Sequence, residues 1–477
     1  MSESEHSFER RVPLWQPMVF AALAGGMGWG VRGQYGHETA AMMAGLLVCL
    51  TLTCLLAPRT HPLALARAAA LGTLGMGIGG SMTYAQTLGL WHDPELVGNW
   101  EALRWGVLGT SLKGAIWIGF GGLFFGMGLG GVRYRPGEMF MLLLAMLGLF
   151  FTGVSLVNSP FDISERELPY IYFSASWHFQ PDTPGLKPRP EIWAGLLAAL
   201  IAGILYTGWR RKDGLAWRLG LWAMLGGAIG FPAGQAIQSY NAWNREAVAE
   251  GVLHPIVQHI NWWNMMETTF GAVMAAFIGL GLWLHRKRIA PAEPNLDGRL
   301  STAGEVALLL IHVPMLVSVE FLSLRSVDSL YDLGLIMVII PLCGVVGGRY
   351  WPYLQLLPLT LIPIAGKTLR NLGYEEGAVN VQVGWVVYVI LPVALFVWLA
   401  WVAIKRSQTG RPSRALFGWM LLVNAWMYYL LNFAFFRFPW PWDTWTGRTP
   451  NAIIYTICLA GLTWVAFRAM TEREAEE

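Results

Sequence analysis

Charged residues are scarce in this chain, and so are cysteines. Asp, Glu, Lys and Arg make up 13% of the 477 residues, against roughly 25% in an average soluble protein. The 30 acidic and 33 basic residues nearly cancel and are scattered along the chain, which excludes a disordered protein and a basic nucleic-acid-binding protein. Because Cys49, Cys54, Cys343 and Cys458 all lie inside apolar runs, a disulfide scaffold is excluded as well.

Motifs for nucleotide binding and hydrolysis are also lacking. The sequence contains no Walker A, HExxH, GxSxG or CxxC spacing, which excludes ATP-driven pumping within this chain and the usual metalloprotease and serine-hydrolase mechanisms. His254 and His259 are five residues apart, which is a poor pair for one helix face, and His37 with Glu38 is no better. We therefore expect no metal, no cofactor and no nucleic-acid partner.

Long apolar runs are what the chain does have. Hydrophobic residues make up 55% of it, and the mean hydropathy is +0.45. A helix needs about twenty mostly apolar residues to cross roughly 30 Å of hydrocarbon, and on that rule the sequence predicts an all-α polytopic membrane protein with about fourteen transmembrane helices. The predicted spans start near Trp15, Glu38, Leu65, Leu103, Met139, Glu191, Leu215, Trp262, Thr302, Ser329, Trp351, Gln382, Ser413 and Asn451.

Basic residues indicate the direction of these spans. With the N-terminus in the cytoplasm, about two thirds of the 33 Lys and Arg residues fall on the cytoplasmic side. This predicts cytoplasmic termini in a bacterial inner (plasma) membrane, and the clusters GWRRKDG and LHRKRIA are typical of ordinary stop signals. A hydrophilic, proline-containing stretch divides the chain into an eight-helix unit (1–289), a cytoplasmic linker (290–301) and a six-helix unit (302–477).

Similar phrases recur in the first eight spans. Glycine-rich phrases follow one another in alternate helices, such as AGGMGWGVRGQ from Ala24 and AMLGGAIGFPAGQ from Ala223. The intervening helices carry Glu38, Glu191 and Glu267 at their starts, with Thr110 in the corresponding place of the fourth span. We therefore expect four tandem helical hairpins, although small residues also serve simply for close helix packing. For Glu191 we expect only an interaction with the helix dipole.

Lys113 is the polar residue that the sequence places deepest, about ten residues into its predicted span. An ammonium there costs at least about 2.5 kcal/mol on insertion scales, so it should face a partner or a water-filled cavity. Repeat register makes the fourth and eighth spans equivalent, which predicts Glu267 as the partner of Lys113. We expect a polar cavity open to the outside, and its predicted lining residues are Arg32, Gln34, Glu38, Lys113, Gln235, Gln238 and Glu267.

Two functional classes fit these features, with a structural subunit of a larger complex as a third. Repeated hairpins, interrupted helices and an intramembrane lysine favour a secondary transporter of a small polar solute, sugar-like or anionic. Predicted outer loops rich in Trp beside Asp, Asn, His and Arg also suit a glycan. The alternative is a membrane-embedded transferase acting at the extracytoplasmic face on a lipid-linked or glycan substrate, with His37, Glu38 or Glu267 as general base. The expected partners are the lipid bilayer and a solute, with partner subunits left open.

Overall fold

The computed structural model describes residues 12–35, 38–57, 60–82, 84–175, 178–182, 187–291, 300–322, 324–332, 334–409, 414–436 and 444–471. Regular structure within these ranges is helical, apart from isolated bridge residues such as Asp162 and Glu167, which form an antiparallel bridge. The chain is therefore an all-α protein, as the apolar runs predicted. The predicted linker at 290–301 lies mostly outside the described residues.

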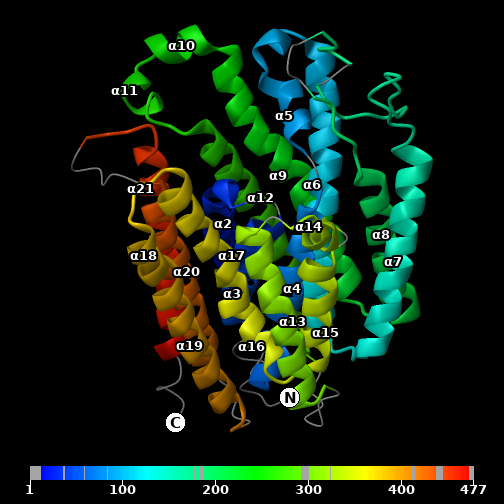
Figure 1. Cartoon of the computed structure of the whole chain (residues 1–477), viewed down its shortest axis with the longest axis vertical. Helices are drawn as coiled ribbons and strands as arrows, with labels where there is room; N and C mark the ends of the chain where they lie inside the picture. The colour runs from blue at the N-terminus through cyan, green and yellow to red at the C-terminus, as the bar shows by residue number, and fades with distance from the viewer. Residues whose placement is uncertain are drawn as a thin grey trace.

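The helices follow one another in chain order (Figure 1). The α-helices of the first 291 residues are α2 (Trp15–Gly30), α3 (Glu38–Leu56), α4 (Pro62–Gly80), α5 (Ala85–His92), α6 (Trp100–Leu129), α7 (Pro136–Val157), α8 (Trp193–Leu205), α9 (Ala216–Trp243), α10 (Arg245–Glu250), α11 (His254–Val257) and α12 (Trp262–Leu284). Those that follow are α13 (Thr302–Phe321), α14 (Arg325–Asp332), α15 (Ile340–Gly347), α16 (Trp351–Leu356), α17 (Pro358–Leu369), α18 (Val381–Gly384), α19 (Leu391–Ser407), α20 (Arg414–Phe436) and α21 (Thr449–Thr471). Short 3-10 or π-helical segments are η1 (Val31–Gln34), η2 (Pro94–Leu96), η3 (Tyr206–Arg210), η4 (Arg286–Arg288), η5 (Leu335–Ile339), η6 (Arg370–Glu375) and η7 (Trp385–Ile390).

Side-chain caps fix where several of these helices begin. The side chain of Asn99 accepts hydrogen bonds from the backbone N–H groups of Glu101 and Ala102, so α6 starts at Trp100. Asn261 caps α12 in the same way through the N–H of Asn264. Asn is among the best N-caps because its short side chain satisfies N–H groups that have no partner inside the helix.

Nine helices in the described part of the chain are long and apolar enough to cross a membrane. A tenth is obtained if the pair Arg325–Tyr331 and Leu335–Gly347, bent by 55°, counts as one broken span. The protein is therefore an integral membrane protein of the helical class.

Six of the helices form a closed arrangement that we call the six-helix ring. Around it, α2 packs on α3, α3 on α4, α4 on α6, α6 on α9, α9 on α12, and α12 again on α2. The hairpin of α7 and α8 packs against the outside of α6 and stands at one edge of the molecule (Figure 1). The later helices cover the opposite part of the ring, where α16 contacts α4, α17 and α20 contact α3, and α21 contacts α2. Of the four hairpins that the sequence predicted as repeats, three thus lie in the ring and one lies beside it.

Glycines let the ring helices touch through their backbones. A Cβ atom added to Gly25 of α2 would overlap the carbonyl oxygen of Gly271 in α12, and one added to Gly114 of α6 would overlap that of Gly227 in α9. Such close approach is the usual role of small residues between membrane helices. The ring is consequently packed tightly along these seams.

Candidate functional site

We name the two ends of the bundle to describe the site. The basic end is the end at which α2 begins and α21 ends. There the guanidinium of Arg468 donates to Gln16 Oε1 over 3.0 Å. The opposite end, which we call the loop end, carries α5, α10, α11 and the segment between α7 and α8 (Figure 1). Arg32 follows the 16-residue α2, so it lies about 25 Å from the basic end, and Lys113 lies about 24 Å before the end of α6. Both cations therefore sit at about the same level, and Lys113 lies close to the middle of α6.

Arg32 and Glu267 form a buried ion pair at this level. The α-helix α2 ends at Gly30 and tightens into the 3-10 segment η1, on which Arg32 lies. Its Nη2 atom is 3.1 Å from Glu267 Oε1 and also donates to the hydroxyl of Tyr84. Because Arg32 and Glu267 are only 2% and 4% exposed, this pair is enclosed within the protein.

Aromatic rings surround the guanidinium of Arg32. Its Cζ atom lies 4.9 Å from the ring centroid of Trp29, 5.4 Å from that of Trp117 and 5.6 Å from that of Tyr84. The faces of these rings are negative and attract a cation. The aromatic lining continues into the six-helix ring through Phe270, whose ring centroid lies 4.8 Å from that of Trp29.

Three acceptor oxygens on α9 and α12, the helix that carries Glu267, are buried without a hydrogen-bond donor among the described residues. They are Glu267 Oε2, Asn264 Oδ1 and Gln235 Oε1. Asn264 lies one turn before Glu267 on α12, and its amide nitrogen donates to the carbonyl of Gly30 over 3.0 Å. An unpaired buried acceptor costs about 1–3 kcal/mol. These oxygens can therefore accept further hydrogen bonds from O–H or N–H groups.

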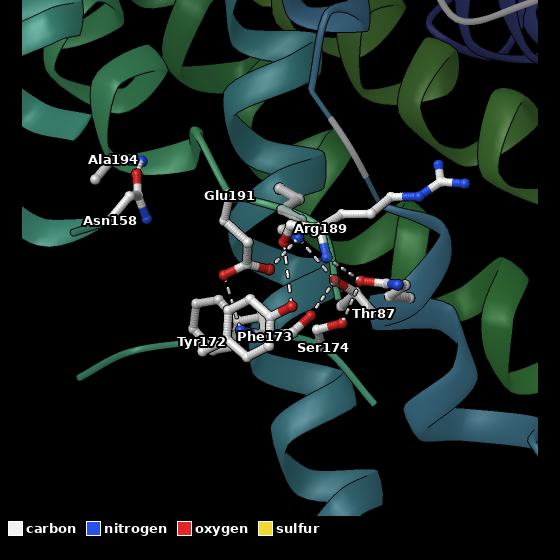
Figure 2. A network of polar contacts seen from close by, with 10 residues as sticks. Thr87, Asn158, Tyr172, Phe173, Ser174, Arg189, Glu191 and Ala194 are labelled. Carbon is white, nitrogen blue, oxygen red and sulfur yellow. Dashed lines mark hydrogen bonds and ion pairs between the residues drawn. The ribbon is translucent and has the colours of Figure 1, made fainter. Parts of the chain in front are cut away.

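Lys113 belongs to a second buried ion pair, whose carboxylate is Glu191 (Figure 2). Its Nζ atom donates to Glu191 Oε1 and to Thr87 Oγ1, both at 2.7 Å. The other oxygen of Glu191 accepts the backbone N–H of Phe173 at 2.9 Å. The hydroxyl of Thr87 in turn donates to the carbonyl of Phe173. Every member of this pair is thus hydrogen-bonded.

Further hydrogen bonds fasten the part of the chain near Phe173 and Glu191 to α5. Gln86 of α5 accepts hydrogen bonds from Ser174 Oγ at 2.9 Å and from the backbone N–H of Arg189 at 3.1 Å (Figure 2). A cavity of about 20 Å³ remains between Tyr84, Lys113 and Glu191, which has room for about one water molecule. The segment near Phe173 and Glu191 is therefore held against α5 and α6.

The structure corrects the predicted pairing. Lys113 pairs with Glu191 and not with Glu267, because α9 packs between α6 and α12 in the ring. Glu191, expected only to complement a helix dipole, is the carboxylate that holds Lys113. Arg32 and Glu267 do lie together. The expected opening to the outside is not seen at these side chains, since Arg32, Lys113 and Glu267 are each at most 4% exposed.

Four predicted site residues remain: Gln34, Glu38, Gln235 and Gln238. Gln235 and Gln238 are buried on α9, where the amide of Gln235 donates to Gln238 Oε1 over 3.1 Å. The side chains of Gln34 and Glu38 lie outside the described part of the structure. Sequence reasoning missed Tyr84, although the phrase that contains it, LGMGIGGSMTYAQ, belongs to the predicted repeat.

Comparison with family profiles, with curated proteins and with solved structures finds no match to this chain. The geometry of the site is therefore the basis on which its function is assigned.

Proposed function

We propose that the protein is a secondary transporter of a small polar solute, sugar-like or anionic, that binds beside the Arg32–Glu267 pair. One observation carries this proposal: at the point where α2 gives way to η1, a buried ion pair lies next to acceptor oxygens that lack donors among the described residues. Interrupted helices with charged and polar groups inside a helical bundle are typical of transporter binding sites.

The chemistry of the lining favours a solute with hydroxyl groups. Glu267 Oε2, Asn264 Oδ1 and Gln235 Oε1 are acceptors, so they would accept hydrogen bonds from hydroxyls. The rings of Trp29 and Trp117 offer apolar faces on which a sugar ring stacks. A solute that also carries an anionic group would compete with Glu267 for the guanidinium of Arg32.

Transport requires the site to open, because its side chains are enclosed in the described conformation. Alternating access moves one group of helices against another around a fixed site. Glycine contacts such as Gly25 against Gly271 give flat seams along which helices of the ring can shift. The conformation described is the occluded one in this scheme.

The proposed setting is a bacterial inner membrane, with fourteen spans, both termini in the cytoplasm and hairpins that are repeats of one another. Beyond the helices that are long and apolar enough to span, α2, α3, α9 and the pair α16 and α17 pack beside them within the bundle. Adding these four to the ten gives the proposed count. The first and last helices meet at the basic end through Arg468 and Gln16, which supports termini on the same side.

Counterflow in liposomes tests the proposal. Purified protein is reconstituted into vesicles loaded in turn with unlabelled neutral sugars, sugar phosphates and carboxylates, and uptake of the matching labelled solute is followed. We expect transient accumulation of a hydroxyl-bearing solute that is absent from protein-free vesicles. Covalent turnover of a glycan donor without any accumulation would contradict the proposal and favour the transferase.

A further inference from the structure

A second, larger cavity lies at the basic end, far from the Arg32–Glu267 pair. It has a volume of about 710 Å³, within the range of about 300–1,000 Å³ that ligand sites occupy. Its charged lining consists of Arg67, Arg133, Arg135, Arg210, Arg211 and Glu138. Five guanidinium groups against one carboxylate give the cavity a strongly positive lining, which suits a phosphate group.

Contacts within the protein orient two of these arginines and leave the others available. Arg211 Nε lies 2.9 Å from Glu138 Oε1, and Arg67 donates to the carbonyl of Gly348 over 2.8 Å. Arg133, Arg135 and Arg210 are exposed and form no ion pair among the described residues. The cavity therefore keeps unneutralised positive charge that the protein itself does not use.

An apolar groove of about 570 Å³ follows the cavity along the bundle. Its lining includes Phe120, Leu147, Leu196 and Met337. The same three helical segments bound both spaces. On α4, Leu71 faces the cavity and Gly77 the groove. On α7, Glu138 faces the cavity and Leu143 the groove. On each helix the two residues are about 8–9 Å apart along the helix axis.

On the third boundary, formed by η5 and α15, Val346 faces the cavity and Ile339 the groove, about 10 Å apart along the axis. A positive cavity at the end of the bundle thus leads into an apolar groove between membrane helices. This is the distribution of polarity of an anionic lipid, whose phosphate sits at the membrane surface and whose chains lie in the hydrocarbon.

We infer that the cavity and the groove together form a binding site for an anionic phospholipid from the leaflet at the basic end. The phosphate binds among Arg133, Arg135 and Arg210, and an acyl chain lies in the groove beside Leu147. Basic pockets between membrane helices are known to recognise anionic head groups. This inference does not depend on the proposed transport function, because the site shares no residue with the Arg32–Glu267 pair.

Binding of radiolabelled phosphatidylglycerol to the purified, delipidated full-length protein in detergent tests the inference. We expect phosphatidylglycerol to bind at least about tenfold more tightly than phosphatidylcholine. The double variant Arg133→Gln/Arg210→Gln should lose about tenfold or more in affinity. The matched control is Lys405→Gln/Arg406→Gln, which removes the same charge from exposed positions in the last turn of α19 and should bind within about twofold of the wild type.

Two further measurements separate a lipid from a soluble phosphate. Leu147→Trp narrows the groove without changing charge, so it should weaken phosphatidylglycerol binding while leaving the melting temperature close to that of the wild type. Equal loss in the control variant, no loss in Leu147→Trp, or displacement of phosphatidylglycerol by millimolar inorganic phosphate would each overturn the inference.

Discussion

The two buried ion pairs of this protein lie in similar surroundings, but their carboxylates differ in how many of their oxygens have hydrogen-bond donors. Lys113–Glu191 and Arg32–Glu267 lie at the same level of the bundle, and all four side chains are nearly inaccessible. Both oxygens of Glu191 have donors, namely Lys113 and the N–H of Phe173. Glu267 uses one oxygen for Arg32, while the other has no donor among the described residues.

This difference separates a pair that is complete within the protein from the pair beside which we propose that the solute binds. A buried pair repays its desolvation only when further hydrogen bonds satisfy its remaining atoms. The pair of Lys113 meets that condition within the protein and anchors the segment near Phe173. The pair of Arg32 does not, and the missing donors are what a solute would supply.

The largest expected effect comes from breaking the completed pair. Lys113→Met leaves the Glu191 carboxylate buried without its cation, so we expect the free energy of unfolding to fall by about 3–5 kcal/mol. Thermal unfolding of the protein in detergent measures the loss. The double variant Lys113→Met/Glu191→Gln should recover most of it, because Gln still accepts the N–H of Phe173, and it should retain transport. If the double variant is stable but inactive, the assignment of this pair as structural is wrong.

The second effect concerns the incomplete pair. Arg32→Gln/Glu267→Gln removes both charges together and should stay within about 1.5 kcal/mol of the wild type in stability. Loss of one hydrogen bond to a charged group costs about 1.5–3 kcal/mol, so solute affinity should drop about 10- to 100-fold. Counterflow against solute concentration gives this value. If this variant binds the solute with wild-type affinity, the proposal that the solute binds beside Arg32 and Glu267 is wrong.

A glycine substitution tests the packing that surrounds both pairs. Gly25→Ala brings a Cβ atom onto the backbone of Gly271, which we expect to destabilise the protein by about 1–3 kcal/mol. Gly148 of α7 is the control, because a Cβ atom there meets nothing within 4 Å. Gly148→Ala should be neutral or stabilising by up to about 1 kcal/mol. Equal melting temperatures for the two variants would mean that the ring is not closely packed at Gly25.

The smallest effect concerns Asp213, a third buried carboxylate that lies outside the spans. It accepts hydrogen bonds from Tyr134 Oη at 2.9 Å and from the N–H groups of Leu215 and Ala216. Burial raises the pKa of Asp213. The fold thus prefers the protonated acid, whose contribution to stability is complete below the unfolded-state pKa and is lost as pH rises through the folded-state pKa.

Asp213→Asn keeps a side-chain oxygen that accepts the N–H groups of Leu215 and Ala216 and removes the titration. The variant should match the wild type in stability near pH 4 and exceed it by under about 1 kcal/mol near pH 7. Melting temperatures of both proteins between these pH values check the sign. If the stability of the variant relative to the wild type falls from pH 4 to pH 7, the fold favours the ionised carboxylate and the expected sign is wrong.

The sequence predicted the class of fold and part of the site, for reasons that depend on local patterns. Apolar runs of span length report burial in lipid directly, and glycine spacing indicates close helix packing. Arg32 and Glu267 were both candidates because charged residues near interrupted helices are costly unless they are used. Their mutual contact was not predicted, since it depends on which helices are neighbours in the ring.

The pairing of Lys113 could not be read from local patterns. Glu191 reaches it only because the long segment between α7 and α8 folds back over α6 and α5, and that segment has no helical periodicity. The basic cluster GWRRKDG was interpreted as a stop signal, which accounts for its charge but not for its place beside Arg133 and Arg135. That proximity is created by hydrogen bonds across the two turns, from Arg211 to the carbonyl of Arg133 and from Tyr134 to Asp213.

The length of α6 has a practical consequence for structure determination. Its 30 residues measure about 45 Å, whereas the hydrocarbon of a bilayer is about 30 Å thick. Both α6 and the 28-residue α9 that packs on it are therefore longer than the hydrocarbon is thick, so part of this pair of helices extends beyond the hydrocarbon. An antibody fragment raised against this projecting pair of helices would add a rigid, detergent-free mass to the particle and would align images without touching the interior of the ring.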